Sequence, residues 1–115
     1  MAGQVSYVER NTNPLLDLDI NCNGHLQVFE ACRQANIKAR LIFASSRFVY
    51  GKIDYNPVDE GHSFNCLSIY SIHKLAGEKY YRLYHDAYDL ETVSVRIANP
   101  YGSSRLLKNS FTYDP

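Results

Sequence analysis

The sequence has few of the residues that build metal and redox sites. It contains no tryptophan, one methionine and three cysteines among 115 residues. Cys22, Cys32 and Cys66 are odd in number and widely spaced, and no Cys-x-x-Cys pair occurs, so neither a zinc site nor a redox motif is indicated. The four histidines lack metal-ligand spacing as well. We therefore expect no metal site and three reduced, mostly buried thiols.

The sequence also lacks an excess of charge and a long apolar run. Twelve basic and twelve acidic residues balance to a formal net charge of +0, which gives no electrostatic reason to expect nucleic acid or an acidic membrane as a partner. No apolar run approaches the roughly 20 residues that span a bilayer. The first residues do not combine a basic segment with an apolar one, as a signal peptide does. We expect a soluble cytoplasmic protein without a membrane or nucleic-acid partner.

What is present predicts one small globular unit, since 45% of the residues are hydrophobic. A helix is predicted from Pro14 to Asn36, because Pro14 suits a first-turn position after Asn13 as the cap. Apolar residues on several of its faces predict a helix that is covered on two sides. The main apolar stripe of this helix is expected to comprise Leu15, Leu18, Cys22, Leu26 and Phe29.

Two short strands and a second helix follow. Arg40–Ser46 and Thr92–Ala98 are apolar or β-branched runs that predict buried strands. Between them, helical periodicity extends from Ser68, the expected cap, to about Asp89. The order of elements predicts an α/β fold with a parallel sheet. The expected apolar stripe of the second helix comprises Ile72, Leu75, Ala76, Leu83 and Ala87.

Two strands are too few for a stable parallel sheet. A helix covered on two sides likewise needs more sheet than this sequence supplies. We therefore interpret the sequence as an internal part of a larger protein.

Tyr70 and Lys74 are the first candidates for chemistry. Their four-residue spacing places both side chains on one face of the second helix, one turn apart. An isolated tyrosine titrates near pH 10, but a nearby ammonium favours the phenolate and so makes proton transfer workable. Taken alone, the pair is more often a chance feature of a helix surface.

Ser45 and Ser46 strengthen this interpretation. They end the first predicted strand, and ligands bind at the carboxyl ends of strands in open α/β sheets. A serine hydroxyl there can bond to a substrate oxygen while a tyrosine moves the proton. The alternative for the two serines is an ordinary strand-end turn.

Four ordered segments resemble those of extended short-chain dehydrogenases/reductases, the NAD-dependent epimerases and dehydratases of nucleotide sugars. The UDP-glucose 4-epimerase-like members are the most similar. The resemblance implies that residues 1–102 are a partial domain of this family, namely the central and carboxyl-terminal half of a Rossmann-type doubly wound parallel sheet. Residues 103–115 show no recognisable pattern. The four segments are Phe43–Gly51, Pro57–Glu60, Ser68–Lys74 and Arg96–Gly102.

The resemblance also implies site residues. Ser46 corresponds to the catalytic Ser/Thr of the family, and Tyr70 to its acid/base. Lys74 corresponds to the lysine that holds the nicotinamide ribose and tunes the tyrosine. Ser46 is expected to contact the substrate as well as to take part in catalysis.

Four further residues are implied to bind the cofactor or the substrate. Ala2 and Gly3 are similar to the segment that lies along the cofactor, although the usual histidine is missing. Asn21 corresponds to a cofactor-side asparagine, and Asn99 to an asparagine that contacts the nucleotide sugar. The alternatives are a helix-surface amide for Asn21 and a loop turn for Asn99.

Two departures qualify the resemblance. Arg47 and Phe48 stand where dehydratases and decarboxylases of the family carry acidic residues, and elimination needs a group that protonates the leaving hydroxyl. Epimerase-type or simple reductase-type chemistry is therefore favoured over dehydration. The glycine-rich loop that binds the NAD pyrophosphate is absent from the 115 residues, so this segment alone is expected to bind NAD weakly or not at all.

Three interpretations of function remain. The first is part of an NAD-dependent nucleotide-sugar epimerase that forms a 4-keto sugar, with a homodimer built through helices 14–36 and 68–89. The second is a noncatalytic truncated remnant, at best a dimerisation module. The third is a reductase of the same superfamily.

Overall fold

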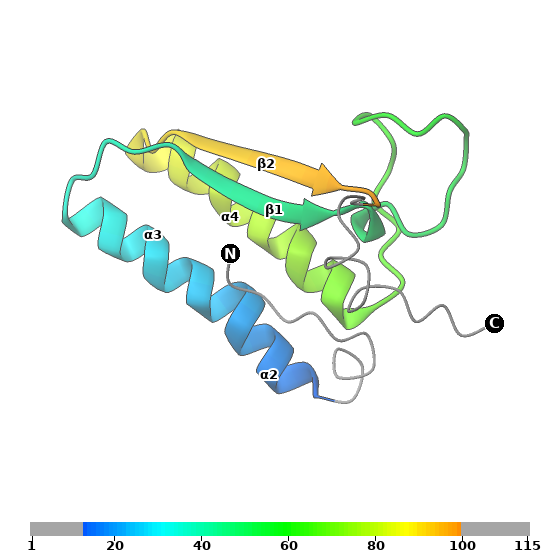
Figure 1. Ribbon diagram of the computed structural model, residues 1–115, viewed down its shortest axis with the longest axis horizontal. Coiled ribbons are helices and arrows are strands. Elements are labelled where there is room, and N and C mark those ends of the chain that lie inside the picture. The colour runs from blue at the N-terminus through cyan, green and yellow to red at the C-terminus, as the bar shows by residue number, and fades with distance from the viewer. Residues whose placement is uncertain (1–12, 100–115) are drawn as a thin grey trace, which may run out of the picture.

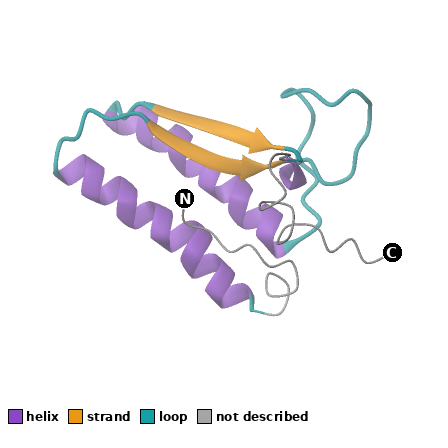
Figure 2. Ribbon diagram, viewed as in Figure 1, coloured by secondary structure: helices purple, strands orange, loops and turns teal. Residues whose placement is uncertain are grey.

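The computed structural model describes residues 13–99, which form two helical segments packed on one face of a two-stranded parallel sheet (Figure 1, Figure 2). The first helical segment consists of α2 (Pro14–Leu18), a π-helical turn η1 (Asp19–Asn23) and α3 (Gly24–Gln34). Strand β1 (Leu41–Ser46) and a 3₁₀ turn η2 (Arg47–Val49) follow. Helix α4 (Ile69–Tyr88) and strand β2 (Thr92–Ile97) complete the order. The predicted sequence of elements and the partial α/β fold are confirmed.

The two strands run parallel, with Leu41 opposite Thr92 and Ser46 opposite Ile97. Their carboxyl ends therefore lie at the same edge of the sheet, where Rossmann-type folds bind ligands. The side chain of Phe43 in β1 points toward the helices and contacts rings from both of them, His25 and Tyr81. The centre of the core thus lies between β1, α3 and α4.

The first helical segment differs from the single regular helix that the sequence predicts. Asn13 does cap it, accepting a hydrogen bond from the backbone N–H of Leu16. A π-turn contains an additional residue, however, and so rotates the face that the preceding turn presents. Leu15 and Leu18, expected in the buried stripe, are 76% and 44% exposed, and Asp17 is fully buried in their place.

Helix α4 begins as predicted but buries a different face. Ser68 caps it through a reciprocal pair of bonds with Ser71, and Asp89 ends it in the left-handed conformation. The predicted apolar stripe was wrong, because Ile72 and Leu83 are more than half exposed. The buried face instead carries a glycine together with polar and aromatic residues: Ser71, Lys74, Gly77, Glu78, Tyr81 and Tyr84.

A cluster of rings forms the core, and a close approach of helix to strand holds it together. Phe29, Phe43 and Tyr81 pack with centroid separations of 4.3 to 4.8 Å, supported by Tyr84 and Leu90. Gly77 allows this packing, because a Cβ atom there would lie 2.5 Å from the Cζ atom of Phe43.

The other face of the sheet carries exposed apolar side chains. Ile42, Val93, Val95 and Ile97 are 37–66% exposed on the face away from the helices. All three cysteines are free thiols as predicted, but only Cys22 is buried, whereas Cys32 and Cys66 are half-buried. Within residues 13–99, no helix is long and apolar enough to cross a membrane.

Candidate functional site

Ser46 lies at the end of β1, and Tyr70 lies near the start of α4. Ser46 is the last residue of β1, and its hydroxyl accepts a 3.3 Å hydrogen bond from the backbone N–H of Phe48, the middle residue of the η2 turn. The Phe48 ring then lies edge-on to the Tyr70 ring, with centroids 6.5 Å apart. The turn after β1 therefore places Ser46 and the Tyr70 ring in one region, although 24 positions separate them in the numbering.

Lys74 connects this region to the strand. Its side chain is buried between α4 and β1, and its ammonium donates a 2.9 Å hydrogen bond to the backbone carbonyl of Ala44. The Nζ atom lies 5.6 Å from the centroid of the Tyr70 ring and 5.0 Å from that of Phe43. Lys74 thus connects the Tyr70 ring to β1, the strand that ends at Ser46, and the catalytic roles that the resemblance implies for the three residues stay predictions.

The charge of Lys74 acts on two neighbouring side chains, the half-buried His25 and the buried Cys22. Burial lowers the pKa of His25, and the Lys74 ammonium lowers it further. Burial raises the pKa of the Cys22 thiol, and so does the Asp17 carboxylate, whereas Lys74 opposes them. Because a low-dielectric environment screens charge poorly, the ammonium creates a positive potential at the carboxyl end of β1. A developing oxyanion is stabilised by such a potential.

Asn21 lies in the middle of the π-helical turn and is fully buried, so it is not the helix-surface amide considered as the alternative. Its Nδ2 group donates 3.1 Å hydrogen bonds to the backbone oxygen and to Oδ1 of Asp17. Its Oδ1 atom has no hydrogen-bond partner among residues 13–99. A buried acceptor without a donor is costly, and π-turns are frequent at functional sites, so Asn21 is a good candidate for a ligand contact.

The remaining predicted site residues are less informative. Asn99 is exposed and lies two residues beyond β2, at the same edge of the sheet as Ser46. Ala2 and Gly3 lie outside the described residues. The roles of these three residues stay predictions.

A polar network that the sequence did not predict joins helix and sheet beside this site. The Ser45 hydroxyl and the Arg96 guanidinium both donate to the buried Glu78 carboxylate, Arg96 through Nε at 3.0 Å and Nη2 at 2.8 Å. Arg96 also donates through Nη1 to the Tyr50 hydroxyl at 2.9 Å. The Glu78 carboxylate raises the pKa of Arg96 further. The sequence signal for this network was an arginine within an otherwise apolar strand, because a buried guanidinium requires an acidic partner.

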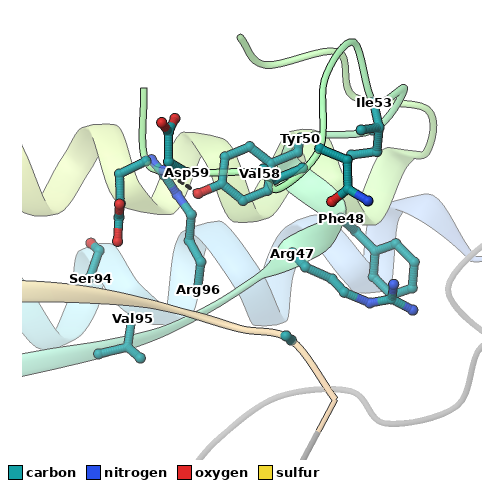
Figure 3. Close-up of a pocket in the computed structure, with 13 residues that line it drawn as sticks. Arg47, Phe48, Tyr50, Ile53, Val58, Asp59, Ser94, Val95 and Arg96 are labelled. Carbon is teal, nitrogen blue, oxygen red and sulfur yellow. Dashed lines mark hydrogen bonds between the residues drawn. The ribbon is translucent and has the colours of Figure 1, made fainter. Parts of the chain in front are cut away.

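A cavity of about 970 Å³ adjoins the network at the carboxyl end of β2 (Figure 3). Arg47 and Phe48 line it from the η2 turn, and Arg96 lines it from β2, with its guanidinium close to the Tyr50 hydroxyl. None of Ser46, Tyr70 and Lys74 lines this cavity. It borders the candidate site through Phe48, whose ring lies against Tyr70.

The parallel sheet with helices packed on one face defines the class of the fold, which is a partial Rossmann-type α/β fold. Among solved structures, UDP-glucose 4-epimerase from Brucella ovis in complex with NAD is similar, at 29% identity and a TM-score of 0.84 over 90% of this chain and 32% of that one. UDP-glucose 4-epimerase from Thermotoga maritima with UDP-glucose has a TM-score of 0.83 at 29% identity, over 89% of this chain and 33% of that one.

A family model identifies the group within this class. The model of the NAD dependent epimerase/dehydratase family matches residues 1–112. A putative UDP-glucose 4-epimerase from Methanocaldococcus jannaschii is 40% identical over 102 residues, which are 88% of this chain. UDP-glucose 4-epimerase from Mycolicibacterium smegmatis is 32% identical over 102 residues, or 89% of this chain. The chain belongs to the NAD dependent epimerase/dehydratase family, and it spans about a third of the length of these curated relatives.

Proposed function

We propose that the protein carrying this chain is an NAD-dependent nucleotide-sugar epimerase that inverts the C4 carbon of a UDP-hexose. The observation that carries the proposal is the approach of Tyr70, Lys74 and the end of β1, with the Lys74 ammonium bonded to Ala44 and 5.6 Å from the Tyr70 ring. The similar UDP-glucose 4-epimerases support the choice of substrate class.

Tyr70 takes the proton from the sugar 4-hydroxyl and later returns it. Lys74 favours the phenolate form that this step needs, because its ammonium lies beside the phenol ring. Ser46 holds the same sugar oxygen through a hydrogen bond while the charge on that oxygen changes. The proton therefore passes between the substrate oxygen and Tyr70 through both half-reactions, and the sugar is a 4-keto sugar between them.

The described residues fit the nicotinamide half of NAD. The buried Asn21 oxygen requires a donor, which the cofactor or a water held by it can supply. Lys74 and Tyr70 lie on the α4 face directed toward the end of β1. When bound, NAD supplies the hydride acceptor. The residues that hold its pyrophosphate are expected in the glycine-rich loop, which is not part of these 115 residues.

Phe48 supports epimerisation over dehydration. Elimination of water requires an acid beside the leaving hydroxyl, and the Phe48 ring, next to Tyr70, cannot transfer a proton. A second candidate is a dehydrogenase of the same family. It is favoured by the similarity to uronate dehydrogenase from Pseudomonas syringae, which is 38% identical over 73% of this chain.

The experiment uses the intact gene product, meaning the protein encoded by the complete reading frame that carries this sequence. The purified protein is incubated with NAD and, separately, UDP-glucose, UDP-N-acetylglucosamine and UDP-glucuronate, and products are separated by chromatography and weighed by mass spectrometry. We expect one of these sugars to form its C4 epimer without change of mass. Net formation of NADH would instead establish the dehydrogenase, and a 4-keto-6-deoxy product would contradict both candidates.

A tyrosine variant tests the proton transfer. Tyr70→Phe should lower turnover at least about a hundredfold, the usual contribution of a positioned acid/base, with cofactor binding retained. Tyr88→Phe is the matched control, because it removes the same hydroxyl from an exposed tyrosine of the same helix. Near-normal turnover of Tyr70→Phe would exclude Tyr70 as the acid/base.

We also propose a homodimer through the outer faces of α2–α3 and α4. Apolar side chains on these faces, such as Leu15, Val28, Ile72 and Leu83, are 49–76% exposed, which is unfavourable unless another surface covers them. Light scattering of the intact gene product should give twice the monomer mass. Leu83→Lys should reduce that mass toward the monomer value, whereas Lys79→Ala on the same helix should not.

A further inference from the structure

We propose that Asp17 and His73 are positioning residues for this site, acting as one unit that fixes Asn21 on one helical segment and Lys74 on the other. This inference rests on the proposed function. Neither residue carries a role in the resemblance described above, and neither contacts the region of Ser46 directly.

A fully buried carboxylate lies at the centre of this unit. The Asp17 side chain has no exposed surface, and its Oδ2 atom accepts a hydrogen bond from Nδ1 of His73, 56 residues later. Its Oδ1 atom accepts the 3.1 Å bond from Nδ2 of Asn21. Each carboxylate oxygen therefore has its own donor. Asn21 donates from the first helical segment, and His73 donates from α4. A buried carboxylate is costly unless such donors are supplied, so the fold retains both.

The unit determines how Asn21 is oriented. With Nδ2 committed to Asp17, the amide cannot rotate, and Oδ1 remains as the acceptor that no residue of the described range 13–99 satisfies. Asn21 lies in the π-turn and Asp17 four residues earlier in α2, and this spacing places the Asn21 amide within reach of Asp17. Loss of the carboxylate would leave the Asn21 amide with one bond, to the Asp17 backbone oxygen, and so would loosen the orientation of Oδ1.

The unit also anchors the start of α4. His73 directly precedes Lys74, and its backbone oxygen accepts a second contact, 3.8 Å from the Cys22 thiol of the π-turn. Two contacts from His73, one with Asp17 of α2 and one with Cys22 of η1, thus fix α4 against the first helical segment just where the Lys74 side chain leaves the helix. Since Lys74 must reach the Ala44 carbonyl, a small shift of this turn would displace its ammonium.

A pair that only stabilises the packing of the two helices would make the same contacts. The test therefore measures activity per folded molecule separately from the stability of the fold. Asp17→Asn retains the shape but has one oxygen instead of two, and it cannot accept from both His73 and Asn21. In the intact gene product, we expect kcat per folded molecule to fall about tenfold or more, with KM for the nucleotide sugar changed less than about threefold. Asp86→Asn is the matched control, because it removes the charge of an exposed aspartate that is paired with Arg82 on the same helix.

Two variants of His73 provide the second arm. His73→Asn retains a donor near the position of Nδ1 and should retain most of the activity, whereas His73→Leu removes the donor and should reproduce the loss of Asp17→Asn. A kcat of Asp17→Asn or His73→Leu within about twofold of the natural protein, at equal folded fraction, would overturn the proposal. If Asp17→Asn does not fold, the two His73 variants decide.

A readout without turnover distinguishes failure of this inference from failure of the proposed function. Inactivity of the natural protein on every nucleotide sugar would refute the function but not the positioning. In that case, ¹³C NMR of labelled tyrosines reports the titration of Tyr70, which faces Lys74, with Cys22 and His25 as the other titratable groups around that ammonium. The midpoint should move in His73→Leu and not in His73→Asn, and an unmoved midpoint in His73→Leu would refute the positioning role.

Discussion

Removing the charge of Glu78 should destabilise the protein far more than removing an exposed charge. The Glu78 side chain is 8% exposed and holds the Arg96 guanidinium, itself 20% exposed, through hydrogen bonds of 2.8 and 3.0 Å. Glu78→Gln preserves the volume but turns an amide N–H₂ toward a guanidinium N–H, which leaves Arg96 buried without a carboxylate. Breaking a buried pair in this way typically costs about 3–5 kcal/mol.

The matched control is the Arg82–Asp86 pair on the same helix, whose side chains are 78% and 53% exposed. Helix pairs of this kind contribute about 0.3–0.5 kcal/mol, so Asp86→Asn should have a small effect. Both variants of the intact gene product are unfolded in urea and followed by circular dichroism at 222 nm. A loss below about 1 kcal/mol for Glu78→Gln would refute the reasoning, because it would mean that water reaches Arg96.

A double variant tests the same argument from the other side. Replacing both partners by apolar residues of similar size, Glu78→Leu with Arg96→Met, removes the desolvation penalty together with the attraction. Such replacements are often neutral or stabilising. We therefore expect the double variant to be more stable than Glu78→Gln alone.

Two further predictions concern packing and pH. Gly77→Ala should destabilise the protein by about 1–3 kcal/mol, because the added Cβ atom would collide with the buried Phe43 ring. Gly24→Ala is the control and should be neutral or stabilising, because its Cβ atom would lie 3.6 Å from the nearest atom. Thermal melts of the two variants measure the difference. Hydrogen bonds from Arg33 and the Tyr84 hydroxyl lower the pKa of Glu30 from 4.5 to about 2. The contribution of the ionised Glu30 carboxylate to the stability of the folded protein should therefore be fully present above pH 4.5 and disappear as the pH falls toward 2. In Tyr84→Phe, carboxyl NMR should find the pKa of Glu30 higher than in the natural protein, and an unchanged value would exclude the bond.

The order and kind of the elements could be predicted from the sequence because their signals are local. The side chains of Ser68 and Asn13 cap α4 and α2 by accepting a hydrogen bond from the backbone N–H three residues later. The apolar run before Ser46 identified a parallel strand, and the four-residue spacing of Tyr70 and Lys74 placed them on one helical face. Once the strand and helix were correct, the approach of these residues at the carboxyl end of β1 followed from the topology.

The choice of buried faces was decided only by the tertiary structure. Periodicity identified an apolar stripe on α4, but the face that packs on β1 carries Lys74, Gly77 and Glu78, because partners on the sheet satisfy the charges and a glycine lets Phe43 approach. The reason is that burial of a charged side chain depends on a donor or acceptor from a distant segment, which local spacing does not encode.

The π-turn and the Asp17–His73 pair were likewise decided only by the tertiary structure. A π-turn leaves no simple signal in composition, yet it rotates Asp17 inward and Leu15 outward. Asp17 and His73 are 56 positions apart, so their contact exists only because α4 packs against the first helical segment at that level. The sequence by itself thus determined the order of the elements and which residues are candidates for chemistry, whereas the packing of two helices on one sheet face decided which polar groups lie beside those candidates.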